Sequence, residues 1–358
     1  MKKEMKEVVG VPKGITSAGE KIYNALVYEL KSLLDTDITE YEFFVSLPEP
    51  YKIADMEIKE VNFVVNLYPN EELRKPEMLG MGTGGKHMLK ISKTQKPQLV
   101  SFSEDGVCNI KVEIAVPENW TLEMVIEMFK KQRLFFIGVI THELKHEYDS
   151  FKNPNSSLDS VVDYQSAKEL IGGLPPLSKF AYFIYFIHQT ENLVRPSELA
   201  AMIEVGKITK KNFLMFLMNN KTYDTLDSIS KLTLDKLKQA LKKYIGEIKE
   251  IFEANNFDYE GMSDDEIIDE MLQVFFATMM KYKIDIYSNT TMKEVALITL
   301  GFSENDMDDL GTEEFLNKLR KYQDNYKNYF ESEIKRMNRD AVKLKRKLAK
   351  LYSIAKDA

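Results

Sequence analysis

The chain is poor in cysteine and histidine. Its 358 residues contain one cysteine, Cys108, and four histidines. A single cysteine excludes an intramolecular disulfide framework and is compatible with a reducing compartment. Without a cysteine cluster, any bound zinc ion must be held by nitrogen and oxygen atoms. Because histidine is so scarce, a place where two histidines stand close together carries weight.

Long apolar runs are missing as well. The longest, residues 180–187, is well short of the roughly 20 residues that span a bilayer, and its aromatic residues favour a buried helix. The short apolar stretch at residues 8–11 ends at Pro12 and is too short for the apolar region of a signal peptide. The sequence therefore predicts a cytoplasmic protein with no membrane-spanning segment.

The formal net charge of −7 argues against general binding of nucleic acid. A local exception is the basic segment 335–350, near the end of a long expected helix over residues 312–355. We expect this helix to be amphipathic and to offer a surface for a protein-assembly partner. Its expected packing stripe consists of Met337, Val342, Leu344, Leu348 and Leu351.

Hydrophobic periodicity divides the chain into three parts: an N-terminal α+β sheet subdomain (1–120), a central pair of helical segments (121–206) and a helical C-terminal region (207–358). The first part has an amphipathic helix at 16–35 and strands at 41–47, 60–67, 98–102 and 109–116. The second begins with Thr121 as the expected N-cap of one long helix or two abutting helices. Further helices are expected at 177–192, 196–205, 209–219, 232–255, 264–281 and 291–299.

Two of the four histidines lie in the sequence His142-Glu143-Leu144-Lys145-His146, which matches the zinc-binding signature H-E-x-x-H. The strongly apolar residues 133–141 before it indicate a buried helix, and Pro154 predicts its end near Lys152. Residues four apart on a helix lie on one face, with Cβ atoms about 5–6 Å apart. Both imidazoles can therefore point at one ion. Glu143 is rotated by about 100° and can reach a water molecule beside it.

A catalytic zinc site usually has three protein ligands, so a third ligand is expected downstream. The candidates are Glu198, Glu191 and His188, and Glu198 is favoured. Pro196 suits the first turn of a helix that would carry Glu198. The alanines at 200–201 would let this helix approach the motif helix closely.

These features resemble the gluzincin group of zinc metallopeptidases over roughly residues 105–205. The metzincin pattern is excluded, because it needs glycine and histidine where this chain has Asp149 and Lys152. Well-known gluzincins carry Glu-x-x-x-Asp around the third ligand. Here Glu198 begins the pattern Glu-x-x-Ala, and Met202 stands at the aspartate position.

The resemblance implies a zincin-like α+β core, in which a small mixed sheet packs on the motif helix, and a Zn²⁺ cofactor held by His142, His146 and Glu198. Zinc would polarise the scissile carbonyl of a peptide or protein substrate and activate water, with Glu143 as general base. Asp149, one turn after His146, is the expected hydrogen-bond partner of the ligating imidazoles.

The resemblance also implies a donor that stabilises the transition state and a strand that binds the peptide. The donor that stabilises the transition state would be His188, Arg195 or a tyrosine such as Tyr185. Strand 109–116 would be the sheet edge that binds an extended peptide, by analogy with zincins.

The alternative function is that of a structural or assembly protein that keeps a zincin fold and a zinc site with little or no turnover. The large C-terminal region, which carries no recognisable chemistry, fits that role. Small H-E-x-x-H proteins also occur in phage genomes, and this family-level association adds a virion-associated location to the alternatives.

Residues 80–86, Gly-Met-Gly-Thr-Gly-Gly-Lys, match part of a phosphate-binding loop. The next residue is His87 instead of serine or threonine, and residues 88–92 read as a strand instead of a helix. We therefore expect a hairpin or a substrate-side loop here and no nucleotide site.

Overall fold

The computed structural model describes residues 10–34, 40–74, 76–83, 86–92, 95–102, 107–152, 155–157, 173–285 and 326–357. The fold is α+β and mostly helical, with a small mixed sheet, so the coarse prediction of the fold class is confirmed. The expected helix at 291–299 and the first part of the one expected at 312–355 lie outside the described residues. The division into three parts stays a prediction.

The larger sheet has four strands in the order β1 (Glu40–Ile53), β2 (Met56–Asn70), β6 (Val107–Pro117) and β3 (Glu77–Thr83). β1 is antiparallel to β2, β2 is parallel to β6, and β3 is antiparallel to β6. β2 and β6 bury alternate side chains, as expected for strands with one face on a core. A smaller sheet contains β4 (Lys86–Ser92), β5 (Gln95–Phe102) and β7 (Asn155–Ser157).

The sheet topology corrects two predictions. β6, which contains the expected edge strand 109–116, lies between β2 and β3, so its backbone groups are already paired on both sides and it cannot add a peptide. Residues 80–83 belong to β3, and Lys86 begins β4. These two strands belong to different sheets, so the expected hairpin is wrong, while the expected strand after the glycines is confirmed.

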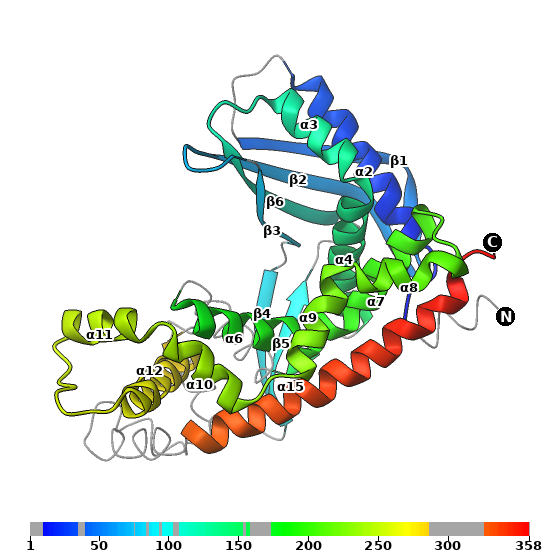
Figure 1. The fold of residues 1–358 in the computed structure, drawn as a ribbon. Helices are drawn as coiled ribbons and strands as arrows, with labels where there is room; N and C mark the ends of the chain where they lie inside the picture. Colours follow the sequence, from blue (N-terminus) through cyan, green and yellow to red (C-terminus); the bar gives the residue numbers. More distant parts are fainter. Residues whose placement is uncertain are drawn as a thin grey trace.

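Two helices contact the larger sheet, α2 (Ile15–Ser32) and α4 (Arg133–Lys152), and α3 (Leu122–Lys131) packs against both of them. Thr121 caps α3 as predicted, because its hydroxyl accepts a hydrogen bond from the backbone N–H of Met124. The helical stretch after Thr121 is two abutting helices that meet at Gln132. α4 lies between the larger sheet and α7 (Gln189–Val205) (Figure 1).

Small residues allow α4 to pack closely against its neighbours. A Cβ atom built on Gly19 of α2 would lie 2.3 Å from Oγ1 of Thr141 on α4. A Cβ atom built on Gly138 would lie 3.0 Å from Cγ of Met202 and 3.5 Å from Cγ of Glu198, both on α7. Glycine at these two positions therefore sets how near α2 and α7 come to the motif helix.

The helical region begins with α6 (Pro175–Phe186) and α7. It continues with four shorter helices, α8 (Lys210–Met218), α9 (Lys221–Ser230), α10 (Leu234–Lys242) and α11 (Ile245–Ala254), and with the longer α12 (Asp264–Asp285). The sequence predicted one helix at 232–255, but the structure has two, because α10 ends at Lys242 and α11 begins at Ile245. It did not predict α9. Within the described residues, no helix has the length and apolar content needed to cross a bilayer.

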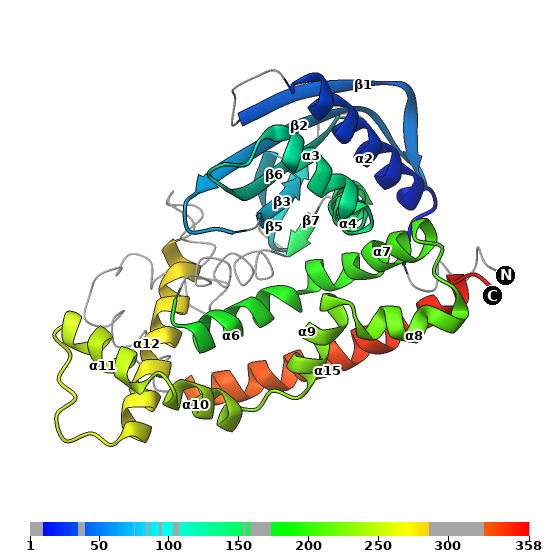
Figure 2. The same ribbon diagram turned by 45° about the horizontal axis from the view of Figure 1, so that its top comes forward.

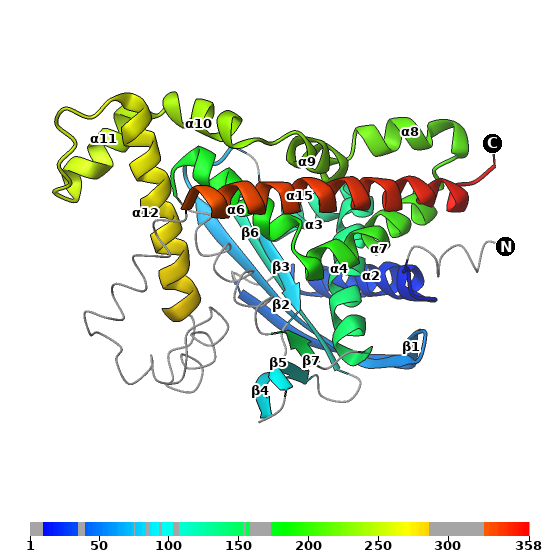
Figure 3. The ribbon, with the colours of Figure 1, turned by 90° about the horizontal axis from the view of Figure 1, so that it is seen from below.

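The last helix, α15 (Tyr326–Ala349), runs past α10, α9 and α7 and ends in a short 3-10 helix, η3 (Lys350–Ile354) (Figure 3). Most of its expected packing stripe is buried, but the prediction is wrong for Val342, which is 37% exposed. α7 lies between α4 and α15 (Figure 2). The chain end returns to the start of α8, where Lys356 N–H donates to the carbonyl of Ile208. The C-terminal region therefore supports α7 from the side opposite α4.

Candidate metal centre

α4 brings the two motif histidines onto one face, as predicted. Phe136, Ile137, Ile140 and Leu144 are almost fully buried, which fixes the rotation of the helix about its own axis. His142 and His146 then lie one turn apart, with their Nε2 atoms 3.2 Å from each other and their ring planes inclined at 70°. Two imidazole nitrogens therefore converge on one point beside α4.

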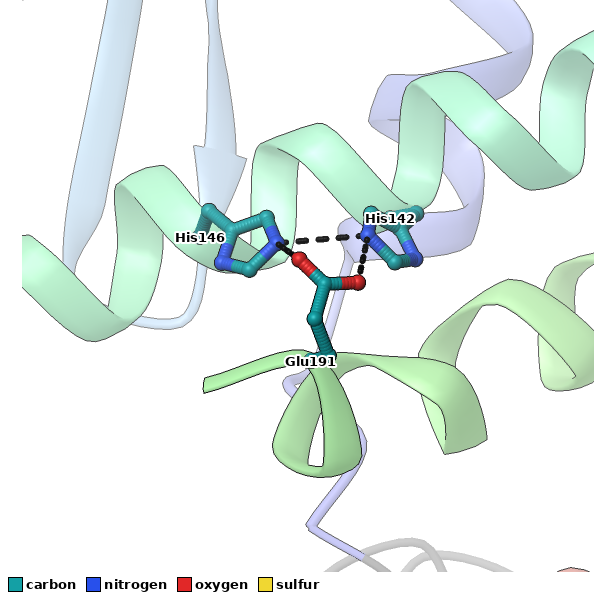
Figure 4. Close-up of side chains that lie close together, drawn as sticks. All are labelled: His142, His146 and Glu191. Atoms are coloured by element: carbon teal, nitrogen blue, oxygen red, sulfur yellow. Dashed lines mark hydrogen bonds and ion pairs between the residues drawn. The ribbon is translucent and has the colours of Figure 1, made fainter. Parts of the chain in front are cut away.

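Glu191 of α7 completes this arrangement. Its Oε2 lies 3.2 Å from Nε2 of His142, and its Oε1 lies 3.3 Å from Nε2 of His146 (Figure 4). One donor atom from each of the three residues lies within 4.8 Å of the other two. Two imidazole nitrogens and a carboxylate oxygen are a donor set that suits zinc.

Glu198, the favoured third ligand, has a different place. Its Oε2 lies 3.2 Å from Nδ1 of His142, the ring nitrogen on the far side from Glu191. The sequence argument required Glu198 to reach both histidines, whereas the structure brings Glu191, the alternative, to both Nε2 atoms. The reason is the length of α7. Pro196 was expected in its first turn, but the helix begins at Gln189 and Pro196 lies inside it. Ligation by either carboxylate stays a prediction.

Arg195 connects the two carboxylates. Its Nη2 donates to Oε2 of Glu191 at 2.9 Å, and its Nη1 donates to Oε2 of Glu198 at 3.0 Å. The guanidinium group also lies over the ring of Phe186, 4.5 Å from its centroid. Both terminal nitrogens thus have carboxylate partners.

Glu143 is buried beside the histidines, and its Oε1 lies 4.0 Å from Nε2 of His142. Burial raises the pKa of Glu143, and the two imidazoles reduce this rise only in part. A carboxylate with a raised pKa and a position next to the converging nitrogens is suited to accept a proton.

The protonation of His142 depends on both Glu191 and Glu198. Burial and the Arg195 guanidinium lower the pKa of His142, but hydrogen bonds with Glu191 and Glu198 outweigh them and raise it from 6.5 to about 9. Burial raises the pKa of Glu191 and Glu198. Hydrogen bonds with the imidazoles and attraction to Arg195 outweigh this effect, so both pKa values lie below the ordinary value of 4.5. Two ionised carboxylates buried beside two imidazoles favour a cation at this point.

Three other predicted residues have local contacts. Asp149 forms an ion pair with Lys145, so the structure gives it a partner on its own helix, and Glu198 takes the position at His142 that was expected for Asp149. His188 is the N-cap of α7, where its Nδ1 accepts from the backbone N–H of Thr190 at 3.4 Å. Tyr185 packs against the hydrophobic core from α6. Donation to a transition state by His188 or Arg195 stays a prediction.

The sequence argument missed the connection between Glu191, Arg195 and Glu198. These residues are spaced i, i+4 and i+7, so they share one face of any helix that contains all three. The signal was present, but a helix start at Pro196 separated Glu191 from Glu198. A helix that begins at Gln189 would have shown the shared face.

The chain was compared with models of known protein families, with curated proteins and with solved structures, and none of them matches it. The candidate centre therefore rests on the sequence motif and the geometry described above.

Proposed function

We propose that the protein is a zinc-dependent metallopeptidase with His142, His146 and Glu191 as the metal ligands. The observation that carries this proposal is the convergence of their three donor atoms within 4.8 Å beside the buried carboxylate of Glu143. The donor set fits zinc in number and kind, since catalytic zinc sites commonly use two histidines and one glutamate. A bound zinc ion supplies Lewis acidity, which polarises a carbonyl group and makes water a stronger acid.

The side chains of the chain would carry the proton transfers. In the proposed reaction Glu143 accepts a proton from the attacking water and delivers it to the leaving amine, so the carboxylate is regenerated at the end of the cycle. Its raised pKa favours the first of these transfers. Glu198 would accept a hydrogen bond from Nδ1–H of His142, which would leave the lone pair on Nε2 available for a metal ion. This orientation would keep His142 in the tautomer that can bind a metal.

An extended peptide could pair with β3. Among the strands that the structure describes, β3 has one sheet neighbour, β6, and it contacts α4. A strand with one unpaired edge beside the motif helix can accept backbone hydrogen bonds from a substrate. We therefore propose β3, in place of β6, as the edge that aligns a peptide with Glu143.

The experiment that tests the function compares wild type with Glu143→Gln. We expect both proteins to retain one equivalent of zinc by elemental analysis and only the wild type to cleave a casein-type substrate. Glu123→Gln, which changes an exposed glutamate in the first turn of α3, is the matched control and should behave as wild type. Zinc in neither protein would overturn the proposed site.

The same experiment separates the peptidase from a structural or assembly protein. Zinc in wild type and Glu143→Gln, with no cleavage by either across a panel of unfolded proteins and peptides, would favour a site that only stabilises the fold. The contact of α15 with α7 is the feature that suits this second function, because it ties the metal-bearing helix to the large helical region.

A further inference from the structure

Four side chains form a closed ring of polar contacts around the candidate centre. His142 Nε2 faces Oε2 of Glu191, which accepts from Nη2 of Arg195; Nη1 of Arg195 donates to Oε2 of Glu198, which faces Nδ1 of His142. The four distances lie between 2.9 and 3.2 Å. The ring is buried, since the exposed fractions of these four side chains are 13% or less. Removing one member therefore leaves its neighbours with an unsatisfied charge away from solvent.

Arg195 donates a hydrogen bond to only one of the two carboxylate oxygens of Glu191. Nη2 donates to Oε2, whereas Oε1 faces His146. An oxygen that accepts a charge-assisted hydrogen bond has less electron density to give to a metal ion. Oε1 is thus the oxygen that is better placed to bind. A ligand that uses one oxygen also leaves room in a tetrahedral site for a water molecule.

The shape of the guanidinium group matters here as well as its charge. Arg195 reaches one carboxylate three residues away and another four residues away on the same helix, which needs two nitrogens in a rigid fork. The guanidinium group also lies over the face of the Phe186 ring, a cation–π contact that restricts its movement. A lysine would keep the charge but has a single nitrogen and no plane to stack.

We infer that Arg195 is a positioning residue that fixes Glu191 as a single-oxygen ligand through Oε1 and holds Glu198 on His142. This inference rests on the proposed metal site and concerns how that site is kept in shape. Arg195 does not touch the ion or the substrate in this role. It sets the coordination number and the affinity through its two carboxylate partners.

The test measures metal binding with Zn²⁺ alone and Co²⁺ alone, without an activity assay. Arg195→Lys and Arg195→Gln are compared with wild type by competition with a chelator of known affinity, and the visible absorption of the Co²⁺ forms reports the coordination number. We expect both variants to bind zinc about 10- to 100-fold more weakly. We also expect weaker visible bands per Co²⁺ ion, because five- and six-coordinate Co²⁺ absorbs less than tetrahedral Co²⁺.

A matched control and a double mutant make the test specific. Arg336→Lys changes another arginine that pairs with a glutamate on its own helix, here Glu333 of α15, and should leave both readouts unchanged. Arg195→Lys combined with Glu198→Gln should weaken zinc binding by less than the product of the single effects, because both act through one ring.

The outcomes separate this inference from the proposed function. Arg195→Lys with wild-type zinc affinity and an unchanged Co²⁺ spectrum would overturn the inference while leaving the metal site in place. Failure of the wild type to bind zinc or cobalt would overturn both. Circular dichroism and the unfolding midpoint identify a variant that has lost its fold. If Arg195→Gln loses its fold, the inference is tested with Arg195→Lys, which keeps the buried charge.

Discussion

The carboxylate of Glu198 lies 3.2 Å from Nδ1 of His142, on the side of the imidazole opposite the Nε2 atom that faces Glu191. One imidazole is therefore held between two carboxylates that come from the same face of α7. This relationship gives the two glutamates separate parts in the proposed centre. In the proposed centre Glu191 would bind the ion, and Glu198 would fix the imidazole ring of His142 that binds it. The first expected result follows from this separation.

Glu191→Gln should weaken zinc binding far more than Glu198→Gln. The first change removes a charged ligand, whereas the second removes a partner of a ligand and should lower zinc affinity by about 10- to 100-fold. Chelator competition on both purified variants measures the difference. If Glu198→Gln abolished binding and Glu191→Gln retained it, Glu198 would be the ligand after all.

The zinc-free protein should lose stability as the pH rises from about 6.5 to about 9. The pKa of His142 is raised from 6.5 to about 9 in the folded chain, so the folded state binds more protons than the unfolded state in this window. The contribution of His142 is fully present below pH 6.5 and is lost as the pH passes about 9. Its size is on the order of 3 kcal/mol, at roughly 1.4 kcal/mol for each pKa unit.

Urea unfolding at intervals of half a pH unit, after treatment with a chelator, measures this slope. His142→Gln is the control, because the variant lacks the titrating ring and should show a flatter profile between pH 6.5 and 9. A wild-type stability that is constant or increasing over this range would contradict the proton balance.

Zinc binding should release about one proton from His142 below pH 9. The ring must be neutral to bind a metal ion, and the two carboxylates keep it protonated in the zinc-free protein. Titration calorimetry in several buffers with different ionisation enthalpies gives the number of protons released. Glu198→Gln should release fewer protons at pH 8, because one of the two contacts that raise the pKa of His142 is gone. Equal proton release by both proteins would argue against this role of Glu198.

Gly19→Ala should destabilise the fold by about 1–3 kcal/mol, as overpacking of a close contact usually does. The added Cβ atom would lie 2.3 Å from Oγ1 of Thr141, so either this hydroxyl must leave its hydrogen bond to the carbonyl of Ile137 or the helices must shift. Gly246→Ala in α11 is the matched control, because a Cβ atom there meets nothing within 4 Å. It should be neutral or stabilising by up to about 1 kcal/mol. Denaturant midpoints of both variants test this expectation, and equal midpoints would show that the contact between Gly19 and Thr141 can be relieved without loss of stability.

The sequence predicted the parts of the centre that depend on local periodicity. The helix of His142 and His146, the cap at Thr121 and the close approach of α7 all follow from residue spacing or size. The sequence did not show which glutamate lies beside both histidines. Proline is common in the first turn of a helix, so Pro196 indicated the start of the helix that carries Glu198. In α7 it lies in the helix interior, where the proline leaves the carbonyl of Asn192 without its usual helical donor. The packing of α7 between α4 and α15 outweighs that local penalty.

Strand order was likewise beyond the sequence. The alternating residues of β6 identify a strand with one buried face, but alternation carries no information on which strands lie beside it. β6 pairs with β2 across a long connection and with β3 across a shorter one, so both of its edges are filled. The pattern could not distinguish this interior position from the edge position expected by analogy.

The six side chains of the proposed centre come from only two helices. Glu143 and the two histidines lie on α4, and Glu191, Arg195 and Glu198 lie on α7. Their relative placement depends on one crossing, set by Gly138 against Met202. A pair of helices of this kind could be transferred to another protein. A designed pair of helices with the same crossing and the same spacings could carry these side chains without the sheet or the C-terminal region, and would need only a hydrophobic cover for the outer face of each helix.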